Sequence, residues 1–179
     1  MRVTLSRLAH QIAEAIAALD GIDARFALIG GLALASHKVV RATQDVDLLV
    51  ESEKADAIEA ELHRLGYRRL HRSSDAANYV RGDERLDVLY ASRPVAKRLL
   101  AGARELKTSL GVLKVVSAEG LVGFKLQALV NDPTRTQDLE DIRALVRANR
   151  SSLDMEEVRG YFRLFEREAL LDEILRDTR

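Results

Sequence analysis

Residues 30–50, GGLALASHKVVRATQDVDLLV, constrain the chain more than any other stretch. Two adjacent glycines stand fourteen residues ahead of an Asp-x-Asp pair, Asp45 and Asp47. If residues 44–50 form a strand, both carboxylates point to the same face, because side chains alternate with a period of two. Neighbouring carboxylates repel each other unless a cation lies between them, and Mg²⁺ accepts such oxygen ligands together with substrate phosphates. The stretch therefore predicts a metal site beside a glycine turn.

The amino-acid composition excludes several classes of protein. The chain has 179 residues, 47% of them hydrophobic and 31% charged, which is typical of a folded globule. It contains no cysteine, which excludes disulfides and thiolate zinc sites. No run of about 18 apolar residues is present, and the charged N-terminal stretch lacks the apolar core of a signal peptide. We therefore expect a cytoplasmic protein without a membrane partner.

The charge balance argues against bulk electrostatic binding to nucleic acid. The 28 basic residues equal the 28 acidic ones, so the formal net charge is zero. Arginines are frequent in residues 64–72 and 143–150, and one interpretation is that they form a local basic surface. The alternative is that both runs are solvated helix and hairpin surfaces.

The order of predicted elements indicates an α+β fold. A first helix, capped by Thr4 or Ser6, is expected to run to about Leu19. The expected strands and helices that follow alternate along residues 25–116: strands at 25–30, 44–50, 67–71, 78–81 and 85–91, helices at 32–38, 53–65 (capped by Ser52) and 94–103, and a hairpin around Gly111. From Ser117 the pattern is helical, with breaks near 131–133 and 149–153. We expect a mixed sheet flanked by helices over residues 1–116 and a C-terminal helical region over residues 117–179.

Asp87 and the double glycine are candidates for the same site. Asp87 is the one acidic residue within the apolar alternation of residues 86–90, and a carboxylate in that setting needs a partner. If its strand lies beside the strand of Asp45 and Asp47, three carboxylates converge and could hold two divalent ions. The alternative is that Asp87 caps a turn or pairs with an arginine. Gly30 and Gly31 would let the backbone approach phosphate oxygens.

Two further charged residues interrupt apolar helical stripes. Lys125 has Leu121, Val122, Ala128 and Leu129 as its neighbours on a helical wheel. Asp138 lies within the stripe formed by Leu139, Ile142, Leu145 and Val146, with Asp141 at its edge. One interpretation is a structural Lys125–Asp138 ion pair between packed helices; the other has Lys125 on a nucleotide phosphate, with Asp138 positioning it.

These motifs together resemble the nucleotidyltransferase superfamily, and within it the AbiEii-type and related small bacterial proteins. The stretch from GGLALASH to RATQDVDLLV is similar to that group's Gly-Gly and Arg-x-Thr/Ser-x-Asp-x-Asp-Leu signature. KLQALVNDPTRTQDLEDI, residues 125–142, is similar to its second signature, a lysine followed by Arg-x-x-Asp-x-x-Asp. Leu32 departs from the group, since many active members have Ser or Thr after the glycines.

The resemblance implies a polymerase-beta-like core with a C-terminal helical part. It further implies the following roles: Asp45, Asp47 and Asp87 as metal ligands; Gly30, Gly31, Arg41, Thr43 and Lys125 as nucleotide contacts; and Asp45, Asp47, Lys125 and Asp138 as catalytic residues. The cofactor would be one or two Mg²⁺ ions, with Mn²⁺ as a substitute. The substrate would be a nucleoside triphosphate, and the acceptor a tRNA end or a protein. Several relatives are toxins, which adds a cognate antitoxin as a partner, and the amphipathic C-terminal helices could serve a homodimer.

The leading hypothesis from the sequence is an Mg²⁺-dependent nucleotidyltransferase. A second is a non-catalytic nucleotide-binding or antitoxin-like partner on the same fold, suggested by the small size and by Leu32. A third is an aminoglycoside-type adenylyltransferase, which needs an acidic acceptor pocket to which Asp83 and Glu84 could contribute.

Overall fold

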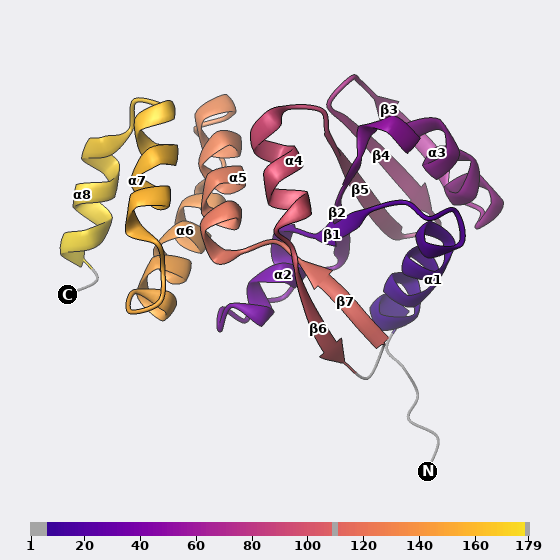
Figure 1. Ribbon diagram of the computed structural model, residues 1–179, viewed down its shortest axis with the longest axis horizontal. Coiled ribbons are helices and arrows are strands. Elements are labelled where there is room, and N and C mark those ends of the chain that lie inside the picture. The colour runs from indigo at the N-terminus through magenta and orange to yellow at the C-terminus, as the bar shows by residue number, and fades with distance from the viewer. Residues whose placement is uncertain (1–6, 109–110, 178–179) are drawn as a thin grey trace, which may run out of the picture. The chain divides into compact units, whose positions relative to one another are not determined.

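The chain folds into two compact units (Figure 1), each of which is described by itself. The computed structural model describes residues 7–108 and 111–177. The first unit comprises the chain up to Leu32 and Ala42–Val116, and the second comprises Ala33–Arg41 and the chain from Ser117 on. Among the described residues, no helix has both the length and the apolar character that crossing a membrane requires.

A seven-stranded mixed sheet forms the centre of the first unit within the described residues, in the order β3-β4-β5-β2-β1-β7-β6. β2 pairs in parallel with β5 and β1 with β7, and the other neighbours are antiparallel. The strands are β1 Phe26–Leu28, β2 Asp45–Glu51, β3 Arg68–Arg72, β4 Ala76–Arg81, β5 Glu84–Ala91, β6 Arg104–Thr108 and β7 Gly111–Val115. This arrangement confirms the predicted α+β class, a mixed sheet flanked by helices.

Two faces of this sheet differ in character. One face carries the alternate apolar residues of β2, β4 and β5, which are buried: Val46, Leu48, Val50, Ala77, Tyr79, Leu86, Val88 and Tyr90. Helix α3 (Ala55–Arg64) reaches this face, since its Glu59 bonds Arg69 and Arg72 of β3, whose register partners are Tyr79 and Ala77. We call it the α3 face. The opposite face carries Asp45, Asp47 and Asp87 and is called the aspartate face.

Helices α1 (Arg7–Gly21) and α4 (Pro94–Ala101) also belong to the first unit. Helix α1 packs with α3, and Figure 1 shows both on one side of the sheet with α4 on the other. The expected cap at Thr4 or Ser6 lies outside the described residues. So do Ser109 and Leu110, between the paired strands of the expected hairpin, β6 and β7.

Ser52 does not cap a long helix, as the sequence led us to expect. Residues Ser52–Lys54 form a short 3₁₀ helix, and α3 begins only at Ala55. The Ser52 hydroxyl lies within donating distance of two oxygens, Glu53 Oε2 at 3.2 Å and the Ala91 carbonyl at the end of β5 at 3.3 Å, and it does not accept from a helical N–H.

The second unit is a helical assembly with its own core. α5 (Ala118–Asn131) packs against α6 (Thr136–Asn149) and α7 (Met155–Leu164), and α8 (Glu168–Asp177) packs against α6 and α7. The predicted cap is confirmed, because the Ser117 hydroxyl accepts from the Gly120 N–H at 3.1 Å. Residues 33–41 belong to this unit through contacts such as the one from the Asn149 amide to the His37 carbonyl, 2.8 Å long. The fully or almost fully buried side chains include Leu121, Val122, Leu126, Ile142, Leu145, Val146, Val158, Phe162 and Ile174.

Candidate active site

Asp45 and Asp47 lie on the aspartate face at the start of β2. Val46 between them is fully buried on the α3 face, while both aspartates are partly exposed. The two carboxylates therefore share one face, as the period-two pattern of a strand requires. Burial of β2 on the α3 face holds its register, because a one-residue slip would bring both aspartates into the core.

Asp87 stands in the neighbouring strand directly beside Asp47. β2 and β5 are parallel, and their register pairs Asp47 with Asp87 and Asp45 with Arg85. One residue of β4 completes the row: Asn78 is the register partner of Asp87, and its Nδ2 donates to Asp87 Oδ1 at 2.8 Å. The strand adjacency on which the predicted convergence depended is thus present. Asp87 is bonded by an asparagine and not by an arginine.

Gly30 lies against Asp47 so closely that no other residue would fit. It begins helix α2 (Gly30–Ser36) with a φ of +65°, and the Ile29 N–H just before it donates to the Asp47 carbonyl at 3.0 Å. A Cβ added to Gly30 would lie 2.0 Å from Asp47 Oδ2. Glycine is required here for both the positive φ and the close approach. The predicted glycine turn and the predicted acidic pair are therefore one local structure.

The donor set of this site fits a divalent ion that arrives with its substrate. Within the described residues, no group of three or more His, Asp or Glu side chains is arranged to hold a metal. Asp45 and Asp47 provide two carboxylates on one rigid strand, and Mg²⁺ is commonly held by one or two carboxylates plus substrate phosphates. These two carboxylates would suit a metal ion that is bound together with a nucleotide.

Lys125 belongs to a buried ionic cluster in the second unit. Its side chain is 8% exposed, and its Nζ lies 3.0 Å from Asp138 Oδ1 and 2.6 Å from Asp141 Oδ2. Arg135 Nε reaches Asp138 Oδ2 at 2.5 Å. Arg41 Nε lies 3.0 and 3.2 Å from the two oxygens of Asp141. These five residues alternate in charge, so each buried carboxylate has two cationic neighbours, and we call them the ionic cluster.

Asp141 is the carboxylate of the cluster with the most polar contacts. Its side chain is 2% exposed, and it accepts from Gln137 Nε2 at 3.0 Å besides its two cations. Burial by itself raises its pKa, but the hydrogen bonds from Lys125 and Arg41 outweigh burial and hold the pKa below the usual aspartate value of 3.8. The carboxylate is therefore charged near neutral pH.

The predicted nucleotide contacts are thus distributed between the two units. Gly30, Gly31 and Thr43 belong to the first unit, and Arg41 and Lys125 to the second. Asn78 was missed by the sequence reasoning, although its position as a polar residue between Ala77 and Tyr79, two apolar ones, was a usable signal.

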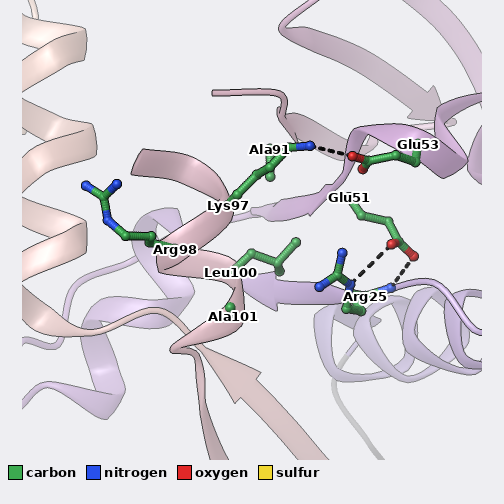
Figure 2. Close-up of a pocket in the computed structure, with 8 residues that line it drawn as sticks. All are labelled: Arg25, Glu51, Glu53, Ala91, Lys97, Arg98, Leu100 and Ala101. Atoms are coloured by element: carbon green, nitrogen blue, oxygen red, sulfur yellow. Dashed lines mark hydrogen bonds and ion pairs between the residues drawn. The ribbon is translucent and has the colours of Figure 1, made fainter. Parts of the chain in front are cut away.

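A cavity of about 290 Å³ lies at the other end of β2 in the first unit. Figure 2 shows two interactions between charged side chains that line it: Arg25 bonds Glu51, and Lys97 bonds Glu53. Glu51 is four residues beyond Asp47, which places the cavity about 13 Å along the strand. These four charges neutralise one another in pairs, and a fifth charged residue, Arg98, also lines the cavity.

The fold is similar to those of several solved structures, among them an antibiotic-resistance factor and an antibiotic adenylyltransferase. The antibiotic-resistance factor ANT(2'')-Ia, in a solution structure, is 22% identical with a TM-score of 0.67, covering 92% of this chain and 95% of that one. In a crystal structure with adenylyl-2''-tobramycin it is 21% identical with a TM-score of 0.67, covering 92% and 99%. The lincosamide antibiotic adenylyltransferase LnuA, bound to lincomycin, is 14% identical with a TM-score of 0.56, covering 79% and 96%.

One family model matches part of the sequence. Residues 11–88 match the aminoglycoside-2''-adenylyltransferase family, a range that includes Gly30, Asp45, Asp47 and Asp87. Comparison with curated protein sequences gives no match. The family match and the fold support the prediction of an enzyme of the nucleotidyltransferase class. The narrower resemblance to AbiEii-type proteins stays a prediction.

Proposed function

We propose that this protein transfers a nucleoside monophosphate from a nucleoside triphosphate to an acceptor hydroxyl and releases pyrophosphate. The observation that carries the proposal is the row formed by Asp47, Asp87 and Asn78, with Asp45 on the same face and Gly30 packed against Asp47. The family match over residues 11–88 supports it independently.

The chemistry assigned to the residues is mainly positioning. Asp45 and Asp47 would hold the metal–triphosphate complex on the aspartate face, and the backbone of Gly30 and Gly31 would contact its phosphates. A bound Mg²⁺ ion would neutralise the charge that develops on the phosphate oxygens. The acceptor oxygen bonds to the α-phosphorus, the bond from that phosphorus to the pyrophosphate oxygen breaks, and the hydroxyl proton is lost. Asn78 fixes the orientation of Asp87 through its hydrogen bond.

Lys125 fits the structural interpretation better than the catalytic one. Its ammonium group already has two carboxylate partners within 3.0 Å in the helical unit. Of the three N–H donors of its ammonium group, two are directed at Asp138 and Asp141, which leaves at most one for a triphosphate oxygen. We therefore assign Lys125 and Asp138 to the stability of the second unit and leave Asp45 and Asp47 as the metal ligands.

The kind of molecule that accepts the nucleotide is a separate part of the proposal. A tRNA or protein acceptor, a toxin role with an antitoxin, a homodimer and a cytoplasmic location remain predictions from the sequence. Aminoglycoside and lincosamide adenylyltransferases among the similar structures make a small molecule the second candidate. Asp83 and Glu84 do not favour a cationic drug, because Arg7 pairs with both and Arg81 binds Glu84 at 2.6 Å.

The test is nucleotide transfer by single variants. We expect the wild type with Mg²⁺ and α-labelled ATP, GTP, CTP or UTP to release pyrophosphate and label an acceptor. Asp45→Asn and Asp47→Asn should each lower the rate by about a thousandfold, several kcal/mol of transition-state stabilisation. Asp75→Asn, in the turn between β3 and β4, is the matched control and should keep full activity. Wild-type rates in both site variants would refute the metal assignment, and nucleotide binding without transfer would favour the non-catalytic alternative.

A further inference from the structure

The arginines of the sheet divide by face into paired and unpaired groups. On the α3 face, Arg69 and Arg72 each lie 2.6 Å from Glu59, and Arg81 lies 2.6 Å from Glu84 and 2.7 Å from Glu14 of α1. On the aspartate face lie Arg68 and Arg85. Both are exposed, and neither forms an ion pair or hydrogen bond through its side chain with another described residue.

The strand register places these two arginines in a row that ends at the acidic pair. Arg68 of β3 pairs with Val80 of β4, Val80 with Arg85 of β5, and Arg85 with Asp45 of β2. Register partners point to the same face, and neighbouring strands are about 4.8 Å apart. Arg85 is thus one strand from Asp45, and Arg68 is about 14 Å from it across the sheet.

A β-bulge adds a third basic group to this surface. The pairing of β3 with β4 shifts between Arg69 and His71, so that His71, and not Leu70, stands opposite Asn78. His71 therefore begins the row that continues through Asn78 and Asp87 to Asp47. The same bulge lets Arg69 and Arg72 both reach Glu59 on the α3 face. A bulge that re-aims side chains next to a site is a common functional device.

We infer that the acceptor substrate is anionic and carries a phosphate group, which Arg68, His71 and Arg85 bind on the aspartate face. The inference rests on the proposed function and adds the class of acceptor to it. Arginine forks match phosphate oxygens in bidentate fashion, and unpaired arginines have their donors available. A polycationic acceptor such as an aminoglycoside would meet repulsion from the two arginines. The phosphate can belong to a small sugar phosphate or to the end of an RNA, and the acceptor hydroxyl would then reach the nucleotide held at Asp45 and Asp47.

The experiment measures acceptor binding and acceptor use separately, with Mg²⁺ present throughout. The binding probes are ribose 5-phosphate, bulk tRNA, unphosphorylated ribose and tobramycin, titrated by calorimetry without nucleotide. We expect one phosphate-bearing probe to bind, and its identity distinguishes the small-molecule source from the RNA source. Arg68→Gln and Arg85→Gln should each weaken that binding about tenfold, the usual scale for a charged hydrogen bond. Added salt should weaken it further.

Arg64→Gln is the matched control, because it removes the same charge from an exposed arginine that pairs with Glu61 on α3. It should leave binding unchanged. Asp45→Asn should keep the phosphate-bearing probe bound while losing transfer, which separates failure of the acceptor assignment from failure of the proposed function. The inference is overturned if neither phosphate-bearing probe binds, if both arginine variants bind like the wild type, or if tobramycin is preferred.

Discussion

The aspartate face of the sheet carries Asp45, Asp47 and Asp87, which we call the acidic row. The acidic row and the ionic cluster of the helical unit use the same residue types for different purposes. In the row, Asp45, Asp47 and Asp87 lie partly exposed on one face, and the bond given to Asp87 comes from the neutral amide of Asn78. In the cluster, Asp138 and Asp141 are buried and each is paired with a lysine and an arginine. Like charges left close together need an external cation, whereas alternating charges satisfy one another.

From this difference we infer that the acidic row serves ligand binding, whereas the ionic cluster serves the stability of the helical unit. The partly exposed carboxylates of the acidic row would be accessible to a metal–nucleotide complex. In the buried cluster each carboxylate is paired with two cations of the same cluster, and removing one member leaves a buried charge with fewer partners.

Removing Lys125 should produce the largest change in stability. Lys125→Met keeps the length and apolar packing of the side chain but leaves Asp138 and Asp141 with one cation each. Breaking a buried pair in this way costs about 3–5 kcal/mol in the free energy of unfolding. Urea denaturation at neutral pH measures the change. Lys107→Met, on the exposed strand β6, is the control, and equal stabilities of the two variants would show that the cluster does not hold the unit together.

Gly30→Ala should damage both stability and activity. The new Cβ would overlap the Asp47 carboxylate, and alanine is strained at a φ of +65°. We expect a loss of about 1–3 kcal/mol in the free energy of unfolding and a large fall in nucleotide transfer, because Asp47 must move. Gly82→Ala is the control: at this turn the φ is +60° and no heavy atom lies within 4 Å of the added Cβ, so the variant has the backbone strain without the steric overlap. If the two variants lose activity equally, contact with Asp47 is not the cause.

Removing the amide that orients Asp87 should have a moderate, purely kinetic effect. Asn78→Ala breaks the 2.8 Å bond without touching Asp45 or Asp47. Removing a residue that orients a metal ligand through a hydrogen bond usually lowers metal affinity or activity by about 10–100-fold. We expect kcat to fall with an unchanged KM for the nucleotide, while Asn131→Ala at the end of α5 keeps both constants. A rise in KM alone would assign Asn78 to nucleotide binding instead.

Acidification should weaken the helical unit through Asp141. Its pKa is lowered in the folded state, so its contribution is fully present above the unfolded value of 3.8 and is lost as pH falls through the folded pKa. Hydrogen exchange of the α5 and α6 amides at pH 6 and at pH 3 measures this loss. Asp141→Asn should be less stable at pH 6 and should show a smaller difference between the two pH values. An unchanged pH dependence in the variant would contradict the role given to Asp141.

The local elements of the fold could be predicted from the sequence, because they follow from periodicity and capping. The strand of Asp45 and Asp47, the Ser117 cap and the helices on either side of Pro133 were predicted close to their observed bounds. The features that the sequence did not predict depend on contacts between residues that are far apart in the sequence. The Ser52 hydroxyl donates to Glu53 and to a carbonyl of β5 and does not cap α3, and residues 33–41 join a unit whose other members begin at Ser117.

The same limit applies to the candidate site. Alternation alone predicted that Asp45 and Asp47 share a face, and the charges of Lys125 and Asp138 within apolar stripes predicted that these two have partners. The position of Asp87 beside Asp47 depends on pairing between β2 and β5, which two other strands separate in the sequence. The bulge that turns His71 toward Asn78 depends on the register of β3 with β4. Register is a property of the assembled sheet, and no single segment encodes it.

The central claim is that the metal–nucleotide complex binds at the acidic row and not at the ionic cluster. Binding of Mn²⁺ together with a non-hydrolysable ATP analogue, followed by electron paramagnetic resonance, tests it directly. We predict bound Mn²⁺ in the wild type, loss of binding in Asp45→Asn and Asp47→Asn, and unchanged binding in Asp141→Asn at a temperature where that variant is folded. Mn²⁺ that stays bound in both row variants, or that is lost in Asp141→Asn, would contradict the claim.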